Sequence, residues 1–256
     1  MRVRVRLFAR QREIAGAREV VVELGSGATV EQAWAAVAAI HPALADGRPY
    51  VRFALNGKYA PPEAPLAEDD EVACIPPVSG GSGEEDADPP APAGPDRILE
   101  LAPAPLPAGL GRELADRLAT AADGAVVIFE GRTRETPGTP APGEEAEARR
   151  HAGRQVQALD YEAFEPLALR VLGEIADGVV ARFRVERLAI VHAVGNVPLG
   201  AISVVIVVCA PHRDAAFDAA RFAMDETKAR APIWKAERFA DGHVWIGHAA
   251  RTDATG

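Results

Sequence analysis

The sequence predicts an α+β protein built from two domains. Its 256 residues exceed the length of about 150 that is usual for a single domain. The composition changes sharply after residue 78, where a stretch rich in Gly, Pro and acidic residues separates two well-patterned regions. Both regions mix strands of alternating apolar residues with segments of helical periodicity. We therefore expect a first domain at 1–81, a disordered linker at 82–96 and a second domain at 97–256.

The first region carries the pattern β-β-α-β-β. Strands are expected at 2–7, 19–24, 51–55 and 71–75, and a helix at 30–40. Ala15-Gly16-Ala17 suits the turn of a hairpin between the first two strands. Thr29 and Gln32 form a capping box that opens the helix, and Asn56-Gly57 suits a second turn. This order, ending in an apolar strand that leads into Gly80-Gly81, is the layout of a ubiquitin-like β-grasp domain.

The second region predicts an α+β domain with a largely antiparallel sheet. Strands are expected at 98–101, 125–129, 156–161, 185–191, 201–209, 234–239 and 244–246, and helices at 110–119, 165–183 and 213–230. The apolar segment 125–129 is interpreted as a buried strand. A second low-complexity stretch at 136–154 interrupts this pattern, which predicts an inserted surface loop.

Charge and hydropathy exclude several classes of protein. The net charge of −9 argues against general nucleic-acid binding, which needs a basic face. The longest apolar run, 197–210, is interrupted by Pro198 and Gly200 and is too short to span a bilayer. The first ten residues lack the continuous apolar stretch of a signal peptide. Cys74 and Cys209 are expected to be buried, reduced thiols. We expect a cytoplasmic protein that binds neither nucleic acid nor membrane.

A double glycine follows the last strand of the first region. An extended tail without side chains can thread a narrow channel, and a terminal glycine carboxylate is open to activation. On composition alone, Gly80-Gly81 is equally well read as the start of a Gly-rich linker. The compact β-β-α-β-β pattern upstream favours a functional tail that ends at Gly81.

His212-Arg213 joins an apolar strand to a helix. An arginine in the first helical turn is unfavourable unless an anion lies between it and the positive end of the helix dipole. Free backbone N–H groups there, together with both side chains, would form a phosphate site. The alternative is that Arg213 is simply solvated.

Lysines are rare in this chain, and two of them lie close together in the sequence. Only three of the 28 basic residues are lysines: Lys58, Lys228 and Lys235. Pro232 ends the helix that carries Lys228, and Lys235 lies in the next strand. Clustered cations lower the pKa of a lysine, which suits proton transfer or attack on an acyl carbon. The alternative is that one lysine stabilises the helix end and the other is solvated.

Two further arginines, Arg132 and Arg134, follow the strand expected at 125–129. With His212, Arg213 and the two lysines they are candidates for binding an anion. Singly, each is also consistent with a solvated loop. The histidines form no ligand spacing with cysteines or carboxylates, so we expect no metal site.

These segments resemble the large subunit of molybdopterin synthase. The matching stretches are GAVVIFEGRTR at 124–134, LDYEAF at 159–164, SVVIVVCAPHRDAAF at 203–217 and KARAPIWKAE at 228–237. The first region is similar to the small subunit, a ubiquitin-like sulfur carrier that ends in Gly-Gly. The whole chain resembles a fusion of the two subunits, with a hammerhead-like α+β catalytic domain at the C-terminus.

The resemblance implies a sulfurtransferase of molybdenum cofactor biosynthesis. Sulfur would be carried as a thiocarboxylate on Gly81 and transferred to cyclic pyranopterin monophosphate, and two transfers would build the dithiolene of molybdopterin. No other cofactor is implied. The implied partners are an enzyme that adenylates and sulfurates the Gly-Gly tail and a second copy of the large-subunit domain. The resemblance implies that Lys228 is the catalytic lysine and Lys235 assists it. It implies a substrate site made of Arg132, Thr133, Arg134, His212, Arg213, Ala236 and Glu237.

The chain departs from the family at three places. His192-Ala193 stands where the family usually has His-Arg, and the loop at 136–154 is longer than usual. Gly81 is internal, and a peptide bond there blocks both adenylation and thiocarboxylate formation. We therefore expect cleavage after Gly81. The alternative function is a non-catalytic ubiquitin-like docking module fused to a domain that binds a phosphorylated ligand.

Overall fold

The computed structural model describes residues 1–77, 96–137 and 153–246, which form two compact units. The first unit ends at Pro77, and the described part of the second begins at Asp96. Gly80-Gly81, nearly all of the predicted linker at 82–96, and most of the predicted loop at 136–154 lie outside the described residues. The two units are described separately.

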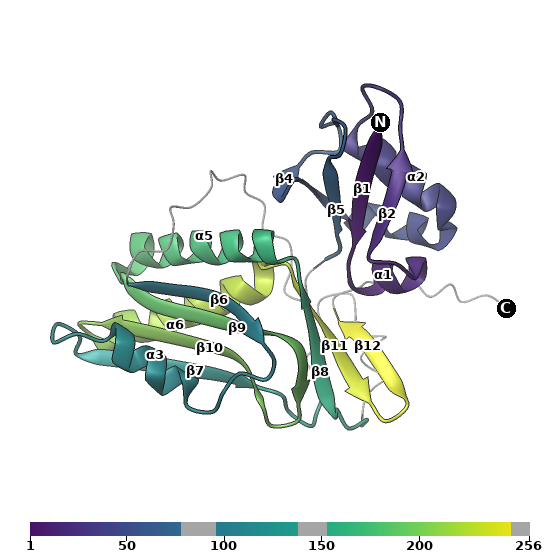
Figure 1. The fold of residues 1–256 in the computed structure, drawn as a ribbon. Coiled ribbons are helices and arrows are strands. Elements are labelled where there is room, and N and C mark those ends of the chain that lie inside the picture. Colours follow the sequence, from purple (N-terminus) through teal and green to yellow (C-terminus); the bar gives the residue numbers. More distant parts are fainter. Residues whose placement is uncertain (78–95, 138–152, 247–256) are drawn as a thin grey trace. The chain divides into compact units, whose positions relative to one another are not determined.

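The first unit is a β-grasp fold, as predicted (Figure 1). Its elements are β1 (Arg2–Leu7), α1 (Ala9–Ala15), β2 (Glu19–Glu23), α2 (Val30–Ile40), the 3₁₀ helix η1 (Pro42–Tyr50), β3 (Arg52–Leu55), β4 (Lys58–Ala60) and β5 (Glu71–Ile75). The sheet order is β2-β1-β5-β3-β4, with β1 and β5 parallel and the other pairs antiparallel. Trp34 and Val37 of α2 pack into an apolar core with the inward face of this sheet.

The predicted capping box opens α2. The backbone N–H of Thr29 donates to Gln32 Oε1 at 3.0 Å. This bond satisfies a donor that a helix start otherwise leaves unpaired, which explains why the helix begins where the sequence predicts.

The connection between β1 and β2 differs from the predicted hairpin turn. The two strands pair antiparallel as expected, but the short helix α1 joins them. Gly16 has φ 67° and ends that helix in the left-handed conformation. The glycine therefore serves as a helix C-cap and not as the centre of a tight turn.

The second unit contains one mixed sheet with helices on both faces (Figure 1). Its elements are β6 (Arg97–Pro103), α3 (Leu110–Leu118), β7 (Ala125–Arg132), β8 (Ala158–Ala163), α5 (Glu165–Phe183), β9 (Arg187–Pro198), β10 (Ile202–Ala210), α6 (Arg213–Arg230), β11 (Ile233–Phe239) and β12 (Gly242–Ile246). The strand order is β12-β11-β8-β9-β10-β7, and β6 pairs with β9. Only β6 and β9 run parallel among the described pairs of this sheet, which matches the antiparallel prediction.

The central strand β10 is buried on both faces. Val204, Ile206 and Val208 belong to the core shared with α5 and α6, whereas Val205 and Val207 belong to the core under α3. This alternation follows from the two-residue period of a strand, and it gives three layers: α5 with α6, the sheet, and α3.

The long strand β9 changes partners at Gly195. Residues up to His192 pair with β10, and Gly195 to Pro198 pair with β8. Gly195 has φ 110°, a conformation that strongly favours glycine. The two halves of the sheet therefore join at this residue.

The strand β7 is less buried than predicted. It lies at the edge of the sheet, and Val126, Ile128 and Phe129 are 43%, 40% and 38% exposed. An apolar run indicates burial only when both faces and both edges are covered, and here one edge has no neighbouring strand among the described residues. None of the helices described is long and apolar enough to cross a membrane.

Candidate functional site

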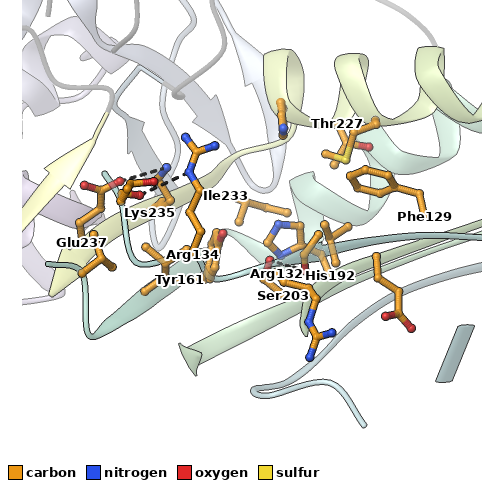
Figure 2. A pocket seen from close by; sticks show the side chains of 18 residues that line it. Phe129, Arg132, Arg134, Tyr161, His192, Ser203, Thr227, Ile233, Lys235 and Glu237 are labelled. Atoms are coloured by element: carbon orange, nitrogen blue, oxygen red, sulfur yellow. Dashed lines mark hydrogen bonds and ion pairs between the residues drawn. The ribbon is translucent and has the colours of Figure 1, made fainter. Parts of the chain in front are cut away.

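A cavity of about 550 Å³ opens in the second unit where β7, β8, β9, β10, β11 and the end of α6 meet (Figure 2). Its walls come from residues that are far apart in the sequence, between Phe129 and Glu237. The cavity lies beside Gly195, because the cavity residue Tyr161 pairs with that glycine across β8 and β9.

Strand register explains which residues of β11 face the cavity. Lys235 lies opposite Tyr161, and Glu237 lies opposite Leu159, and all four line the cavity. The intervening Ala236 is fully buried and does not line the cavity, since successive side chains of a strand point to opposite faces.

Lys235 and Glu237 form an ion pair inside the cavity. Lys235 Nζ is 3.6 Å from a carboxylate oxygen of Glu237, which is 3% exposed (Figure 2). Burial lowers the pKa of Lys235 below its usual value, the Glu237 carboxylate opposes this effect, and Lys228 and Arg134 reinforce it. The ammonium of Lys235 is thus less firmly protonated than that of a solvated lysine.

Lys228 reaches the cavity from the last turn of α6. It is exposed on the helix and lines the cavity beside the buried Thr227. Ala231 ends the helix before Pro232, and the chain then turns into β11. The predicted convergence of the two lysines on one pocket is therefore what the structure has.

Arg132 and Arg134 also line the cavity, from the end of β7 and the loop that follows. Arg132 Nε donates to the carbonyl of Gly200 at 2.8 Å. Arg134 donates to the carbonyls of Thr136 and Pro137, both at 3.3 Å. Each guanidinium keeps further N–H groups beyond these bonds, so both can still contribute to anion binding.

His212 and Arg213 do not line this cavity. They lie at the N-terminus of α6, and both are exposed. Arg213 and Lys228 are fifteen positions apart on α6, which corresponds to about 22 Å along the helix axis. His212 and Arg213 therefore lie away from the cavity of their own chain, and their role in substrate binding stays a prediction.

Thr133 and Gly81 are two further residues of the predicted site. Thr133 is 2% exposed, and its hydroxyl donates to the carbonyl of Val197 at 3.3 Å, so it fixes the end of β7 and does not line the cavity. Gly81 lies outside the described residues. The catalytic and binding roles of all ten residues stay predictions.

Sequence reasoning assigned no site role to several polar residues of the cavity, among them Tyr161, His192 and Ser203. Ser203 Oγ donates to the carbonyl of Gly131 at 3.1 Å. The rings of Tyr161 and His192 meet edge to face, with centroids 4.8 Å apart. Burial raises the pKa of Tyr161 and lowers that of His192 to about 4. A polar residue within an apolar strand was the available signal, but its convergence with distant strands is not visible in the sequence.

No group of three His, Cys, Asp or Glu side chains in the described parts of the chain is arranged to hold a metal ion. The cavity wall includes four cationic side chains, the carboxylates of Glu130 and Glu237, and five neutral polar side chains: Thr136, Tyr161, His192, Ser203 and Thr227. This set suits an anionic ligand that also carries polar ring atoms.

Comparisons with known proteins match two segments of the chain to two families. Residues 109–230 match the model of the MoaE protein family, and residues 5–81 match that of the ThiS family. The molybdopterin synthase catalytic subunit of Oryza sativa subsp. indica is 38% identical over 130 residues, which cover 51% of this chain and 60% of that protein. Catalytic subunit 1 of Aedes aegypti is 36% identical over 131 residues, covering 51% of this chain and 76% of that protein.

Among solved structures, molybdopterin synthase from Staphylococcus aureus is 32% identical, with a TM-score of 0.49, covering 58% of this chain and 96% of that chain. The aligned region of the chain covers 60% of the length of the rice protein and 76% of the length of the mosquito protein. With more than a third of the aligned residues identical over most of the mosquito protein, the chain belongs to the family of molybdopterin synthase catalytic subunits and carries a ThiS-family segment ahead of that domain.

Proposed function

We propose that this chain is a molybdopterin synthase that holds both its sulfur carrier and its catalytic domain. The observation that carries the proposal is the cavity in which Lys228, Lys235 and Glu237 meet two arginines. The substrate is cyclic pyranopterin monophosphate, and sulfur arrives as a thiocarboxylate on Gly81.

The cations of the cavity suit the two charges that this chemistry handles. Arg132 and Arg134 are always protonated and can hold the phosphate through paired N–H donors. Lys228 lies close enough to Lys235 to affect its pKa, so both ammonium groups face one reaction volume. Each can stabilise the oxyanion that forms when a thiocarboxylate carbonyl is attacked.

Each transfer exchanges one oxygen of the substrate for sulfur. The thiocarboxylate sulfur of Gly81 forms a C–S bond to a substrate carbon while the C–O bond at that carbon breaks, and the displaced oxygen leaves protonated, as water or as a phosphate hydroxyl. This gives a thioester between carrier and substrate. Water then cleaves the bond between the carbonyl carbon and sulfur, leaving a Gly81 carboxylate and a thiol on the substrate. Lys228 assists this step, and Lys235 donates or accepts the proton, since its lowered pKa favours exchange. Two transfers complete the dithiolene.

We further propose that two copies of the catalytic domain assemble through the edge strand β7. The start of β7 lies beside the end of β10, just before His212, and its far end lies at the cavity. Antiparallel pairing of β7 with the β7 of a second copy would place the Arg213 of one copy near the cavity of the other. The exposed Val126 and Phe129 would then be covered.

Mixing two impaired variants, assayed at a substrate concentration that wild type binds and Arg213→Ala does not, tests this arrangement. Lys228→Ala and Arg213→Ala chains are unfolded and refolded together, and sulfur transfer is measured. If Arg213 acts in the cavity of the partner, each mixed dimer regains one intact site, and about a quarter of the wild-type activity returns. If Arg213 acts within its own chain, every cavity lacks one cation and mixing restores nothing.

The carrier function requires a free carboxylate at Gly81, so we propose that the chain is cut after that residue. The acidic, Pro-rich sequence at 82–96 is of the kind in which proteolysis concentrates. A mass spectrum of the protein from its native cell should show a fragment ending at Gly81. Full activity of uncut chain without any added carrier would show that this step is wrong.

The central test is sulfur transfer from a separately prepared carrier that bears a C-terminal thiocarboxylate. The chain should convert cyclic pyranopterin monophosphate to molybdopterin with that carrier and fail with its carboxylate form. Binding of the substrate without any conversion would instead favour the non-catalytic docking protein.

A further inference from the structure

His192 lies in the wall of the cavity and is 7% exposed. It belongs to β9, opposite Val204 of β10, and its ring meets Tyr161 edge to face (Figure 2). The mechanism proposed above uses the lysines and the arginines but assigns no role to the imidazole of His192. A buried histidine is costly unless its polar atoms are used.

The hydrogen bond of Nδ1 fixes the form of the ring. His192 Nδ1 lies 2.8 Å from the carbonyl oxygen of Ala193, its own neighbour. A carbonyl oxygen only accepts, so Nδ1 carries the hydrogen. In the neutral ring, Nε2 then holds the free lone pair and acts as an acceptor.

The surroundings keep that ring neutral. Burial lowers the pKa of His192 to about 4, against the opposing effect of its hydrogen bond to Ala193. Nε2 has no partner among the described residues. It is not sealed from solvent either, since in the described part of the chain only Gln11 Oε1 is both sealed and unpaired. Nε2 is therefore an open acceptor on the cavity wall.

We propose that His192 determines specificity, with its Nε2 accepting a hydrogen bond from a ring N–H of the pterin substrate. This inference rests on the proposed function. It concerns recognition of the pterin ring, whereas the arginines recognise the phosphate. The ammonium and guanidinium groups of the cavity only donate, and the Glu237 carboxylate is already paired with Lys235. Glu130 and several hydroxyl groups also line the cavity and can accept, but a ring N–H that lies beside Tyr161 and His192 finds in Nε2 a neutral acceptor with no partner in the described part of the chain.

Two substitutions separate this role from a merely structural one. In His192→Asn, the amide nitrogen can replace Nδ1 and keep the bond to Ala193, but the acceptor at the Nε2 position is lost. In His192→Gln, the amide oxygen can occupy the Nε2 position, while the bond to Ala193 is weakened. If Nε2 accepts a bond from the substrate, His192→Gln should bind substrate more tightly than His192→Asn. If His192 only supports the structure, His192→Asn should bind more tightly than His192→Gln.

The experiment measures the dissociation constants of cyclic pyranopterin monophosphate and of inorganic phosphate for the full-length chain and both variants. We expect His192→Asn to weaken substrate binding by about 3- to 10-fold, the range for one neutral hydrogen bond. His192→Gln should stay within about twofold of wild type. Inorganic phosphate has no ring N–H, so its binding should be the same for all three proteins, which also reports that the cavity is intact.

The inference is overturned if His192→Asn binds substrate as wild type does. It is also overturned if His192→Gln loses as much affinity as His192→Asn, or if phosphate binding falls in parallel with substrate binding. A failure of the proposed function looks different, because wild-type protein itself would then bind phosphate but not the pterin. That result would remove the basis of the inference as well.

Discussion

The two units of this chain bury polar groups in very different ways. Among the described residues, the first unit buries one such side chain, Gln11, and the second buries five: Thr133, His192, Ser203, Thr227 and Glu237. Four of those five line the cavity, and Thr133 fixes the strand end beside it. Buried polar groups cost free energy unless they are satisfied or used. The comparison indicates that the second unit gives up part of its apolar core to build a site, whereas the first folds around an apolar core.

A carrier and a catalyst would differ in this manner. In the proposed function, the first unit needs only to present its C-terminal tail, so its chemistry would lie in Gly80-Gly81, beyond the last strand. The second would hold, orient and protonate a substrate. Variants in each unit test this difference.

The largest effect is expected at Gly81. Gly81→Ile places a β-branched side chain where the tail must be processed and must thread a narrow channel, so product formation should fall to background. Mass spectrometry and a molybdopterin assay on the full-length protein measure both steps. Gly83→Ile, two residues beyond the proposed cut, is the matched control and should behave like wild type. Normal activity of Gly81→Ile would remove the carrier role from the first unit.

Lys228→Ala comes next. Loss of a group that acts in proton transfer or charge stabilisation lowers a rate by about 10²- to 10⁴-fold. The rate of sulfur transfer from a thiocarboxylated carrier is the measurement, and substrate binding and the unfolding curve should change little. Lys58→Ala, in β4 of the first unit, is the control. Equal activities of the two variants would contradict the assignment of catalysis to the cavity.

Arg213→Ala should weaken substrate binding by about 10- to 150-fold, since a charge-assisted hydrogen bond contributes roughly 1.5–3 kcal/mol. The remaining binding should also depend less on salt concentration. Calorimetric titrations at two ionic strengths measure both effects. Arg221→Ala, two turns further along α6, serves as the control. An unchanged dissociation constant would leave Arg213 as a solvated side chain.

The smallest effect concerns the pH dependence of the reaction. The Glu237 carboxylate opposes the lowering of the Lys235 pKa by burial. Glu237→Gln removes that opposition, so the pKa of Lys235 should fall further, and the limb of the rate profile that reports its deprotonation should move to lower pH. At a fixed pH near that limb, the rate should change by at most about tenfold for each pH unit through which the limb moves. Glu226→Gln, on α6, should leave the profile in place, and a limb displaced to higher pH in Glu237→Gln would contradict the pairing.

Local signals made much of the fold predictable. The capping residues of α2 and the ends of α5 and α6 lie within a few residues of the features that determine them. The helix α1 was missed although Ala9, Arg10, Gln11 and Glu13 are good helix formers followed by a glycine, because Gly16 was interpreted as a hairpin turn. The exposure of β7 was missed because an apolar run does not reveal whether its strand lies at an edge.

The site was only partly predictable for a related reason. Lys228 and Lys235 are seven positions apart, and their convergence follows from a helix that ends at a proline. His192 meets Tyr161 through strand pairings that connect distant segments. The separation of Arg213 from Lys228 depends on the length of α6, which the sequence predicts, but the proximity of a second copy does not appear in one chain.

The low lysine content has a consequence for chemical footprinting. Reagents that acylate amines leave guanidinium groups untouched, so only three side chains of this chain can react. Acylation requires the unprotonated amine, and the lowered pKa of Lys235 supplies more of it near neutral pH than a solvated lysine does. Lys235 should therefore be modified ahead of Lys58, and an anion bound in the cavity should reverse that order. The ratio of Lys235 to Lys58 acylation, measured by peptide mass mapping, should therefore report, without any engineered label, whether an anion occupies the cavity.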